Sequence, residues 1–521
     1  MNRRHFVYRC LAASSSIAFA RYGFGAGNLF GGERRPNILF ITADDMSFDA
    51  LGCTGNPLPA ISPNLDRLAG EGLLIDHCHT ATPVCGPARA AWITGTWPHH
   101  NGTMGHYNQP PRWFGESPIT TNIPELLRAK GGYYTGVICK NPTHKGWDDE
   151  ADELHTGLGR DPSKYGRITQ AFIETALRQD KPFFLHPNSA DPHEYWAGQE
   201  YETKAWIDAM MGGRAYATYP NGKPYPDPDR TYTQDQIPVP ASWPDNEAIR
   251  KDIHPYYNSV RRLDQTVGAI LEALKATGQE KNTLIVFLSD NGIGRAFGKW
   301  SLYPLGTRTP MIVKWPGVVA PGRRDRSSVV STIDVAPTFL EAAGVGVPAF
   351  MDARSIMDII RDTGRGDARE KVFTCFNYMN NYPAHDEKYP TYTRDLADKC
   401  DNYRPMRAIH STRYVYIWNG WADGKNQIPL EMSSSQTMRR ILRATGHEDR
   451  AAFEAYRARE EFYDTVKDPG CLVNLIDNPA LASQIDEFRM ELLKIMQRTN
   501  DHETPNFRAD FKVAGPVAPA R

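Results

Sequence analysis

Two short apolar runs along the chain end in acidic or amide side chains. They are residues 36–43, before Asp44 and Asp45, and residues 282–289, before Asp290 and Asn291. A run without polar alternation is typical of a strand that is buried on both faces, as in a parallel sheet. Because ligands bind beyond the carboxyl ends of such strands, we expect these four side chains to lie at a binding edge.

Helical and strand patterns alternate between these two runs. Helices are expected at residues 123–129 and 260–276, and further strands at residues 136–138 and 182–186. Alternating strands and helices indicate an α/β fold. We therefore expect a large, mostly parallel mixed sheet that is sandwiched by helices.

The pattern changes after about residue 364, which indicates a smaller C-terminal unit. Strands are expected at 372–376 and 414–418, and helices near 435–444 and 482–497. We expect an α+β subdomain with an antiparallel sheet. The predicted organisation is a signal peptide at 1–30, a catalytic domain at 35–365, a C-terminal subdomain at 366–505 and a loose tail at 506–521.

Residues 197–245 are rich in Tyr, Pro, Asp and Gly and predict a long surface loop. Long loops of this kind often shape a substrate cleft.

The N-terminus has the order of an export signal. Arg3 and Arg4 precede an apolar, small-residue stretch over 11–20, and adjacent arginines of this kind resemble a twin-arginine signal. We expect a bacterial protein exported to the periplasm or the extracellular space. An ordinary secretion signal or a basic tail are the alternatives. No later run of eighteen apolar residues occurs, so no membrane span is expected.

Charge and cysteine usage narrow the function. Lys and Arg number 60 against 61 Asp and Glu, which argues against a nucleic-acid partner and leaves local cationic pockets for an anionic substrate. None of the eight cysteines forms a C-x-x-C pair, so a zinc ribbon is not expected. Loss of Cys10 with the signal would leave an odd number, so at least one cysteine would be unpaired, modified or bonded to another chain.

The segment from Cys85 to Gly95 carries the most specific motif. Chance produces C-x-P-x-R in a few per cent of chains of this length, and adding Thr94-Gly95 lowers the odds to roughly one in ten thousand. The motif resembles the signature of type I, formylglycine-dependent sulfatases of the alkaline phosphatase superfamily. The alternative is a buried structural cysteine before a helix.

The resemblance implies that a maturase, as a partner, oxidises Cys85 to formylglycine. A hydrated aldehyde has two hydroxyls: one attacks sulfur, and the other then expels sulfate as the aldehyde re-forms. A sulfated thiolate would instead need a separate hydrolysis step.

The resemblance also implies a metal ion. Its ligands would be the residue formed from Cys85 together with Asp44, Asp45, Asp290 and Asn291. Hard oxygen ligands suit Ca²⁺, with Mg²⁺ as second choice. Such an ion lowers the pKa of the nucleophile and polarises the sulfuryl oxygens. Taken alone, Asp44-Asp45 could equally be a helix cap.

Five further residues match the family's catalytic positions: Arg89, Lys140, His144, His193 and Lys299. Arg89 would steady the nucleophile, and His193 would donate to a sulfate oxygen or to the leaving group. Lys299 would reach the sulfate from the loop after Asn291. The Lys140–His144 spacing is two residues longer than the family's Lys-x-His pair, which puts His144 in doubt.

The resemblance covers nearly the whole mature chain, and several stretches resemble the N-sulfoglucosamine sulfohydrolase, or sulfamidase, branch. They are 191–193, 289–293 and 456–459. The implied activity is release of sulfate from N-sulfoglucosamine of heparan- or heparin-type saccharides. Alternatives are an O-sulfatase on a sugar such as glucosamine-6-sulfate, a phosphoester or phosphonate hydrolase of the same superfamily, or a silent glycan-binding protein. The sequence favours no particular oligomeric state.

Overall fold

The structure is a computed structural model. The residues that it describes are 35–105, 121–139, 152–155, 158–194, 196–197, 225–364, 369–378, 403–425 and 433–511. The chain after Arg35 clusters into one unit, Pro36–Arg521.

An eight-stranded sheet forms the centre of this unit, with the order β4-β3-β5-β1-β6-β7-β2-β8. Neighbouring strands are parallel except at β7, which runs antiparallel to β6 and β2. The strands are β1 (Asn37–Ala43), β2 (Leu73–His79), β3 (Tyr134–Cys139), β4 (Glu153–His155), β5 (Phe183–Asn188), β6 (Thr283–Ser289), β7 (Arg308–Lys314) and β8 (Arg323–Ser331). The predicted mostly parallel mixed sheet is confirmed.

A second, antiparallel sheet has four strands in the order β12-β11-β10-β9. They are β9 (Lys371–Tyr378), β10 (Tyr403–Ser411), β11 (Tyr414–Asn419) and β12 (Glu460–Asp464). The predicted C-terminal antiparallel sheet is thereby confirmed.

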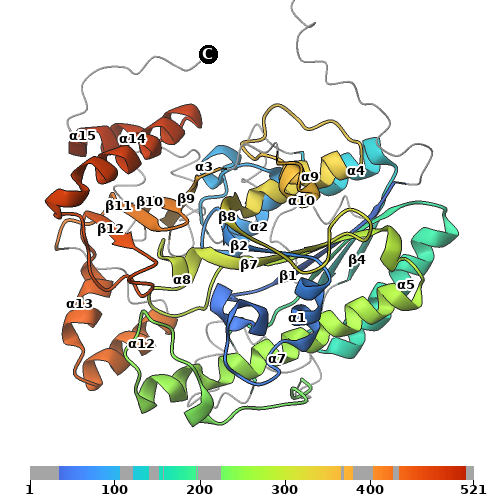
Figure 1. Cartoon of the computed structure of the whole chain (residues 1–521), viewed down its shortest axis with the longest axis horizontal. Coiled ribbons are helices and arrows are strands. Elements are labelled where there is room, and N and C mark those ends of the chain that lie inside the picture. The colour runs from blue at the N-terminus through green and yellow to red at the C-terminus, as the bar shows by residue number, and fades with distance from the viewer. Residues whose placement is uncertain are drawn as a thin grey trace, which may run out of the picture. The chain divides into compact units, whose positions relative to one another are not determined.

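Helices cover both faces of the large sheet and flank the small one (Figure 1). On one face of the large sheet lie α1 (Pro63–Gly70), α5 (Pro162–Arg178) and α7 (Glu247–Ala276), and on the other α2 (Cys85–Thr94), α4 (Ile123–Gly131), α9 (Val335–Ala342) and α10 (Met357–Arg361). The short helix α3 (Pro98–Asn101) lies between α2 and α4, and the short helix α8 (Pro304–Thr307) lies between β6 and β7. The small sheet is flanked by α12 (Ser433–Ala444), α13 (Glu448–Tyr456), α14 (Ala482–Arg498) and α15 (Thr504–Phe511).

Two helical stretches differ from the predictions, one in its start and one in its presence. The helix α7 begins at Glu247, where the Asn246 side chain accepts a hydrogen bond from the Ile249 N–H, and it continues through Pro255. The tail that was expected to be loose from Asn506 is helical as far as Phe511, because Phe507 is buried. Most of the long loop expected at 197–245 lies outside the described residues.

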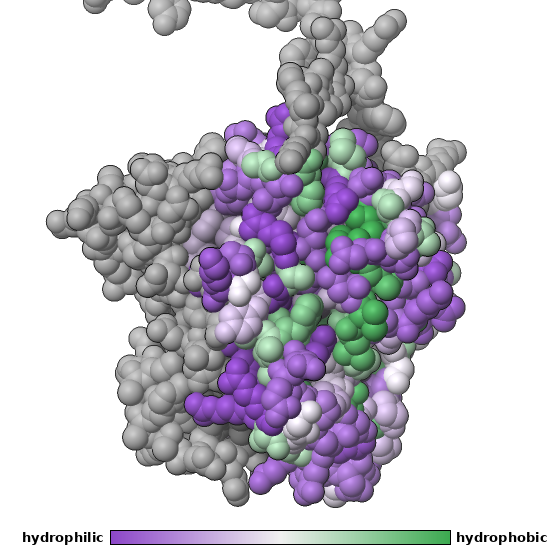
Figure 2. Space-filling view, turned by 90° about the vertical axis from the view of Figure 1, so that its left-hand side faces the viewer, coloured by the Kyte–Doolittle hydropathy of each residue, from purple (hydrophilic) through white to green (hydrophobic). Residues whose placement is uncertain are grey.

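The face that carries the C-terminal helices is mainly hydrophilic, with apolar side chains gathered in a band (Figure 2). Among the described residues, the most exposed large apolar side chains are Val466, Leu472 and Val473, which follow β12. Within the described part of the chain, no helix is both long and apolar enough to cross a membrane.

A pair of buried histidines joins the two sheets. His79 of β2 stacks on His410 of β10 with ring centroids 4.3 Å apart. Each ring has one hydroxyl partner, Thr307 for His79 and Thr374 for His410. Burial lowers the pKa of His410 to about 3, and burial with the nearby charge of His410 lowers that of His79 well below its ordinary value.

This pair predicts a loss of stability in acid. The pKa of His410 is lower in the folded chain than in the unfolded one, so the unfolded chain takes up the proton first as pH falls below about 6.5. At pH 5, protonation of His410 in the unfolded chain lowers the free energy of unfolding by about 2 kcal/mol. His410→Gln should therefore make the free energy of unfolding fall less steeply between pH 6.5 and 5 in denaturant titrations. The control, His155→Gln, changes a histidine with 34% of its side chain exposed. Equal slopes in both variants would contradict the assignment.

Candidate active site

The carboxyl ends of β1 and β6 place the predicted polar residues together. The two strands pair in parallel with Ala43 opposite Ser289. Asp44 and Asp290 are the next residues on their strands, so they leave the sheet side by side. Both carboxylates are fully buried, and the Asp45 backbone N–H donates to Asp290 Oδ1 at 3.0 Å.

Backbone geometry at these strand ends is restrictive. Asp45 has a φ of 64°, in the left-handed region that few non-glycine residues adopt. Gly292, directly after Asn291, has no room for a side chain, because a Cβ would lie 1.8 Å from the Leu305 carbonyl oxygen. Such constraints concentrate at functional sites.

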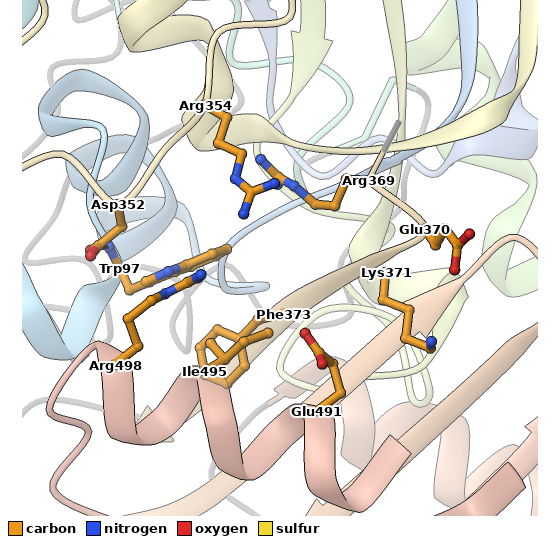
Figure 3. Close-up of a pocket in the computed structure, with 10 residues that line it drawn as sticks. All are labelled: Trp97, Asp352, Arg354, Arg369, Glu370, Lys371, Phe373, Glu491, Ile495 and Arg498. Carbon is orange, nitrogen blue, oxygen red and sulfur yellow. Dashed lines mark hydrogen bonds between the residues drawn. The ribbon is translucent and has the colours of Figure 1, made fainter. Parts of the chain in front are cut away.

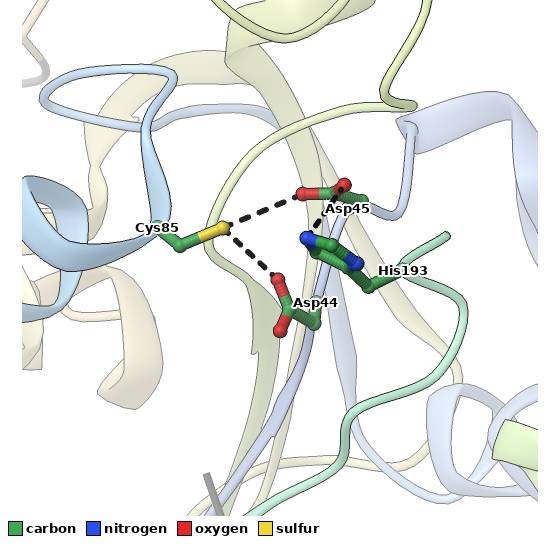
Figure 4. A group of neighbouring side chains, drawn as sticks. All are labelled: Asp44, Asp45, Cys85 and His193. Atoms are coloured by element: carbon green, nitrogen blue, oxygen red, sulfur yellow. Dashed lines mark hydrogen bonds and ion pairs between the residues drawn. The ribbon is translucent and has the colours of Figure 1, made fainter. Parts of the chain in front are cut away.

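Cys85 is the first residue of α2, and its thiol faces the two aspartates (Figure 4). Its Sγ lies 3.1 Å from Asp44 Oδ1 and 3.6 Å from Asp45 Oδ1. The side chain is buried. A helix N-terminus favours negative charge, so an anionic oxygen in place of this Sγ would be stabilised.

Arg89, one turn further along α2, contacts residues at the carboxyl ends of β1, β5 and β6. Its guanidinium donates to Asp290 Oδ2 at 2.8 Å and to Asn188 Oδ1 at 2.5 Å, and it lies 3.7 Å from Asp44 Oδ2. Burial alone lowers the pKa of Arg89, but the charges of Asp290 and Asp44 raise it above its ordinary value. Arg89 is therefore a permanent cation that positions Asp44 and Asp290.

Lys299 approaches the same thiol from the loop after β6. Its Nζ lies 2.6 Å from Asp45 Oδ1 and 2.9 Å from Cys85 Sγ. The loop is tightly folded, with Phe297 and Trp300 at φ values of 65° and 64°. Burial lowers the pKa of Lys299, yet the charge of Asp45 and its neighbours holds it well above the ordinary value. Lys299 thus carries a positive charge directly beside the side chain of residue 85.

The carboxylate and amide oxygens of this cluster fit a hard divalent cation. Ligand atoms of Asp44, Asp45, Cys85 and His193 all lie within 4.8 Å of one another. Asn291 donates through Nδ2 to Asp45, while its Oδ1 is buried without a hydrogen-bond partner among the described residues. A buried acceptor without a donor is costly unless something else satisfies it. An ion held by these oxygens would do so, and carboxylate and amide oxygens suit Ca²⁺ or Mg²⁺.

His193 lies at the open side of the cluster. Its Nε2 is 3.7 Å from Asp45 Oδ2, and 30% of its side chain is exposed. A histidine at the mouth of a buried site can exchange a proton with a bound molecule.

A buried guanidinium–carboxylate cluster that the sequence analysis did not identify holds the His193 loop. Arg160 donates to Asp191 Oδ1 and to the backbone oxygens of His193 and Glu194. Arg262 binds the same Asp191 carboxylate. Burial raises the pKa of Asp191, but the two guanidinium groups hold it below its ordinary value.

The same loop also supports Asp44, whose N–H donates to the Asp191 carbonyl at 3.2 Å. Arg160 and Arg262 therefore position one member of the carboxylate cluster and the histidine together.

Most of the expected site residues come together, and two cannot be located. Lys140 and His144 lie outside the described residues. One contact residue, Asn188, was missed, although the rule that selected Asp44 also applies to it. It ends β5, which pairs with β1 so that Asn188 lies opposite Thr42.

Two family models match the chain. The model described as Sulfatase matches residues 36–345, more than half of the 521 residues. The model described as N-sulphoglucosamine sulphohydrolase, C-terminal, matches residues 292–408.

Individual relatives agree with these matches. Human N-sulphoglucosamine sulphohydrolase is 28% identical over 489 residues, which cover 90% of this chain and 91% of that protein. An N-acetylglucosamine-6-O-sulfatase of Bacteroides thetaiotaomicron is 25% identical over 438 residues, covering 67% and 75%. A solved 2-O GAG sulfatase shares the fold with a TM-score of 0.61 at 18% identity, covering 94% of this chain and 98% of that one.

The Arg160 contacts predict a stability effect. Arg160→Gln removes charged hydrogen bonds to a buried carboxylate that keeps Arg262 as a partner, so the free energy of unfolding should fall by about 2 kcal/mol. Denaturant titration measures this loss. The control is Arg167→Gln, on the exposed side of α5, which should change stability by less than about 0.5 kcal/mol. Equal effects of the two variants would show that Arg160 does not hold the loop.

Proposed function

This chain belongs to the sulfatase family, and from that premise we propose that it releases inorganic sulfate from a sulfated saccharide through a formylglycine made from Cys85. The observation that carries the proposal is the position of the Cys85 side chain. It lies at the N-terminus of α2, between the Asp44 carboxylate and the Lys299 ammonium group. A purely structural cysteine would not need three buried carboxylates and two buried cations around it.

The aldehyde hydrate of residue 85 would supply the attacking oxygen. This oxygen would take the position of the Cys85 Sγ atom, which faces the Asp44 and Asp45 carboxylates. Arg89 keeps Asp44 and Asp290 in position. Lys299 would bind a sulfate oxygen and stabilise the negative charge that develops during transfer.

A divalent cation completes the proposed site, with Ca²⁺ as first choice and Mg²⁺ as second. Asp44, Asp45, Asp290, Asn291 and the modified residue 85 would hold it. When bound, such an ion polarises the sulfuryl oxygens and lowers the pKa of the nucleophile. The Asn291 Oδ1 atom, buried without a partner among the described residues, supports this ligand set.

His193 would donate a hydrogen bond to a sulfate oxygen or protonate the leaving group. Its partial exposure lets it face both the cluster and an incoming saccharide. Lys140 and His144 remain sequence-based proposals for further contacts with the sulfate.

For the substrate, we propose N-sulfoglucosamine of heparan- or heparin-type saccharides. Support comes from the human relative, which matches this chain almost from end to end, and from the sulphohydrolase C-terminal model. An O-sulfated sugar is the second candidate, because the bacterial 6-O-sulfatase has similar identity over two thirds of the chain.

Export through the N-terminal segment, after maturation of residue 85 by a formylglycine-generating enzyme, is part of the same proposal. A twin-arginine route carries folded proteins, so the oxidation could precede transport. The enzyme would then meet sulfated polymers outside the cytoplasm.

The ligand set predicts that Asp290→Ala loses Ca²⁺ and activity together. The substitution removes one proposed oxygen ligand and also leaves the buried Arg89 without its 2.8 Å partner. Calorimetric Ca²⁺ titration and a sulfate-release assay measure the two effects, and circular dichroism checks the fold. Asp477→Ala, at an exposed aspartate, is the matched control. Tight Ca²⁺ binding by a folded Asp290→Ala protein would contradict the ligand set.

The proposed reaction is tested by sulfate release from N-sulfoglucosamine and from glucosamine-6-sulfate. The protein is co-expressed with a maturase, and Cys85→Ala serves as the inactive control. We expect release from the N-sulfated sugar. Release from the O-sulfated sugar alone would keep the mechanism and change the substrate. Faster turnover of an aryl phosphate than of an aryl sulfate would make the protein a phosphoester hydrolase, and no turnover of any of these would favour a glycan-binding role.

A further inference from the structure

A cavity of about 310 Å³ lies beside the small sheet, between its strand β9, helix α14 and the segments next to α3 and α10 (Figure 3). Its walls come from Trp97 before α3, the segment with Arg354, strand β9 and helix α14. Trp97 follows the C-terminal end of α2, whereas Cys85 opens that helix. Ten helical residues span about 15 Å, so this cavity is separate from the proposed active site.

One end of the cavity is strongly basic. Figure 3 shows Arg354, Arg369 and Arg498 around the same end, beside Trp97. Arg369 is paired with the buried Asp334 at 3.0 Å. Arg354 and Arg498 are exposed, and no carboxylate among the described residues pairs with either side chain.

The nearby acidic groups do not neutralise this end. Asp352 Oδ2 already accepts hydrogen bonds from the Trp97 backbone N–H and from His100. Glu370 and Glu491 lie with Lys371 toward the other end of the cavity (Figure 3). Two unpaired guanidinium groups are therefore available to an anion, and guanidinium groups match the oxygens of sulfate and phosphate well.

The floor of the cavity is apolar. Trp97, Phe373 and Ile495 line it, and each is at least nine-tenths buried. The Trp97 Nε1–H has no hydrogen-bond acceptor among the described residues. Seven of the ten lining residues are charged, so the cavity suits a charged, polar ligand, and its volume is at the lower end for small-molecule sites.

We propose that this cavity is a second saccharide site, which binds a sulfate group of a sulfated sugar through Arg354 and Arg498 while the sugar ring covers the apolar floor. A free sulfate ion shares the oxyanion chemistry, but it would leave that floor uncovered. Holding a second unit of a polymer would raise the effective concentration of the chain near the active site when the geometry allows both contacts. The choice of a sulfated sugar as the ligand rests on the proposed function, but the test measures binding in this cavity alone, so its failure is distinguishable from a failure of the reaction proposed for Cys85.

The test uses the full chain with unconverted Cys85, which does not consume the ligand. Glucosamine-6-sulfate is titrated by calorimetry into the parent, the double variant Arg354→Gln/Arg498→Gln, and the control Arg440→Gln at an exposed arginine outside the cavity. The double variant loses two charged contacts, so it should bind glucosamine-6-sulfate in the cavity at least about tenfold more weakly. The control and Lys299→Ala should bind the sugar in the cavity as tightly as the parent does. Equal isotherms for the parent and the double variant would overturn the proposal.

Two further ligands distinguish the source of the oxyanion. Glucosamine without sulfate should not produce the Arg354-dependent event, and inorganic sulfate should bind there clearly more weakly than the sulfated sugar. Inorganic sulfate binding as tightly as the sugar would reduce the cavity to an ion site and overturn the saccharide assignment. If glucosamine and glucosamine-6-sulfate bound equally tightly, the role proposed for Arg354 and Arg498 would be wrong. Circular dichroism and the melting temperature confirm that the double variant is folded.

Discussion

The parallel pairing of β1 with β6 is the constraint on which the site depends. Its register puts Ala43 opposite Ser289, so two acidic segments that are 246 positions apart in sequence leave the sheet at neighbouring points. A shift by one residue would turn each side chain to the other face. The full burial of both strands makes such a shift costly, because their apolar side chains would lose their packing. The fold thereby fixes the relative position of Asp44, Asp45, Asp290 and Asn291 before any ligand is bound.

The electrostatics of the site follow from the close approach of these charged side chains. Among the described residues, three buried carboxylates lie together, and the cationic side chains of Arg89 and Lys299 lie directly against them. Burying charges is costly unless they are paired and hydrogen-bonded. Three negative charges against two positive ones leave an excess that a divalent cation would offset, and Asn291 Oδ1 would gain a partner. The same positive charges that stabilise the carboxylates lie close to residue 85, the proposed nucleophile.

The sequence was sufficient to predict the features that depend on local pattern. Continuous apolar runs predicted β1 and β6, and the motif from Cys85 to Gly95 pointed to Cys85 and Arg89 as site residues. Residues that act through tertiary contacts were not predictable in this way. Arg160 and Arg262 meet at Asp191 only after α5, α7 and the loop after β5 have packed together, and an isolated arginine in a sequence gives no sign of such a role. Asn188 could have been found, since it ends a strand of the same sheet.

The central claim is that residue 85 acts as a formylglycine rather than as a cysteine. The most direct measurement compares sulfate-release activity with the fraction of residue 85 that is converted, determined from the mass of the peptide that contains it. Samples of graded conversion are obtained by expression with increasing amounts of maturase. The account predicts activity proportional to the converted fraction and none in its absence. Full activity in protein whose residue 85 is entirely unmodified cysteine would contradict it.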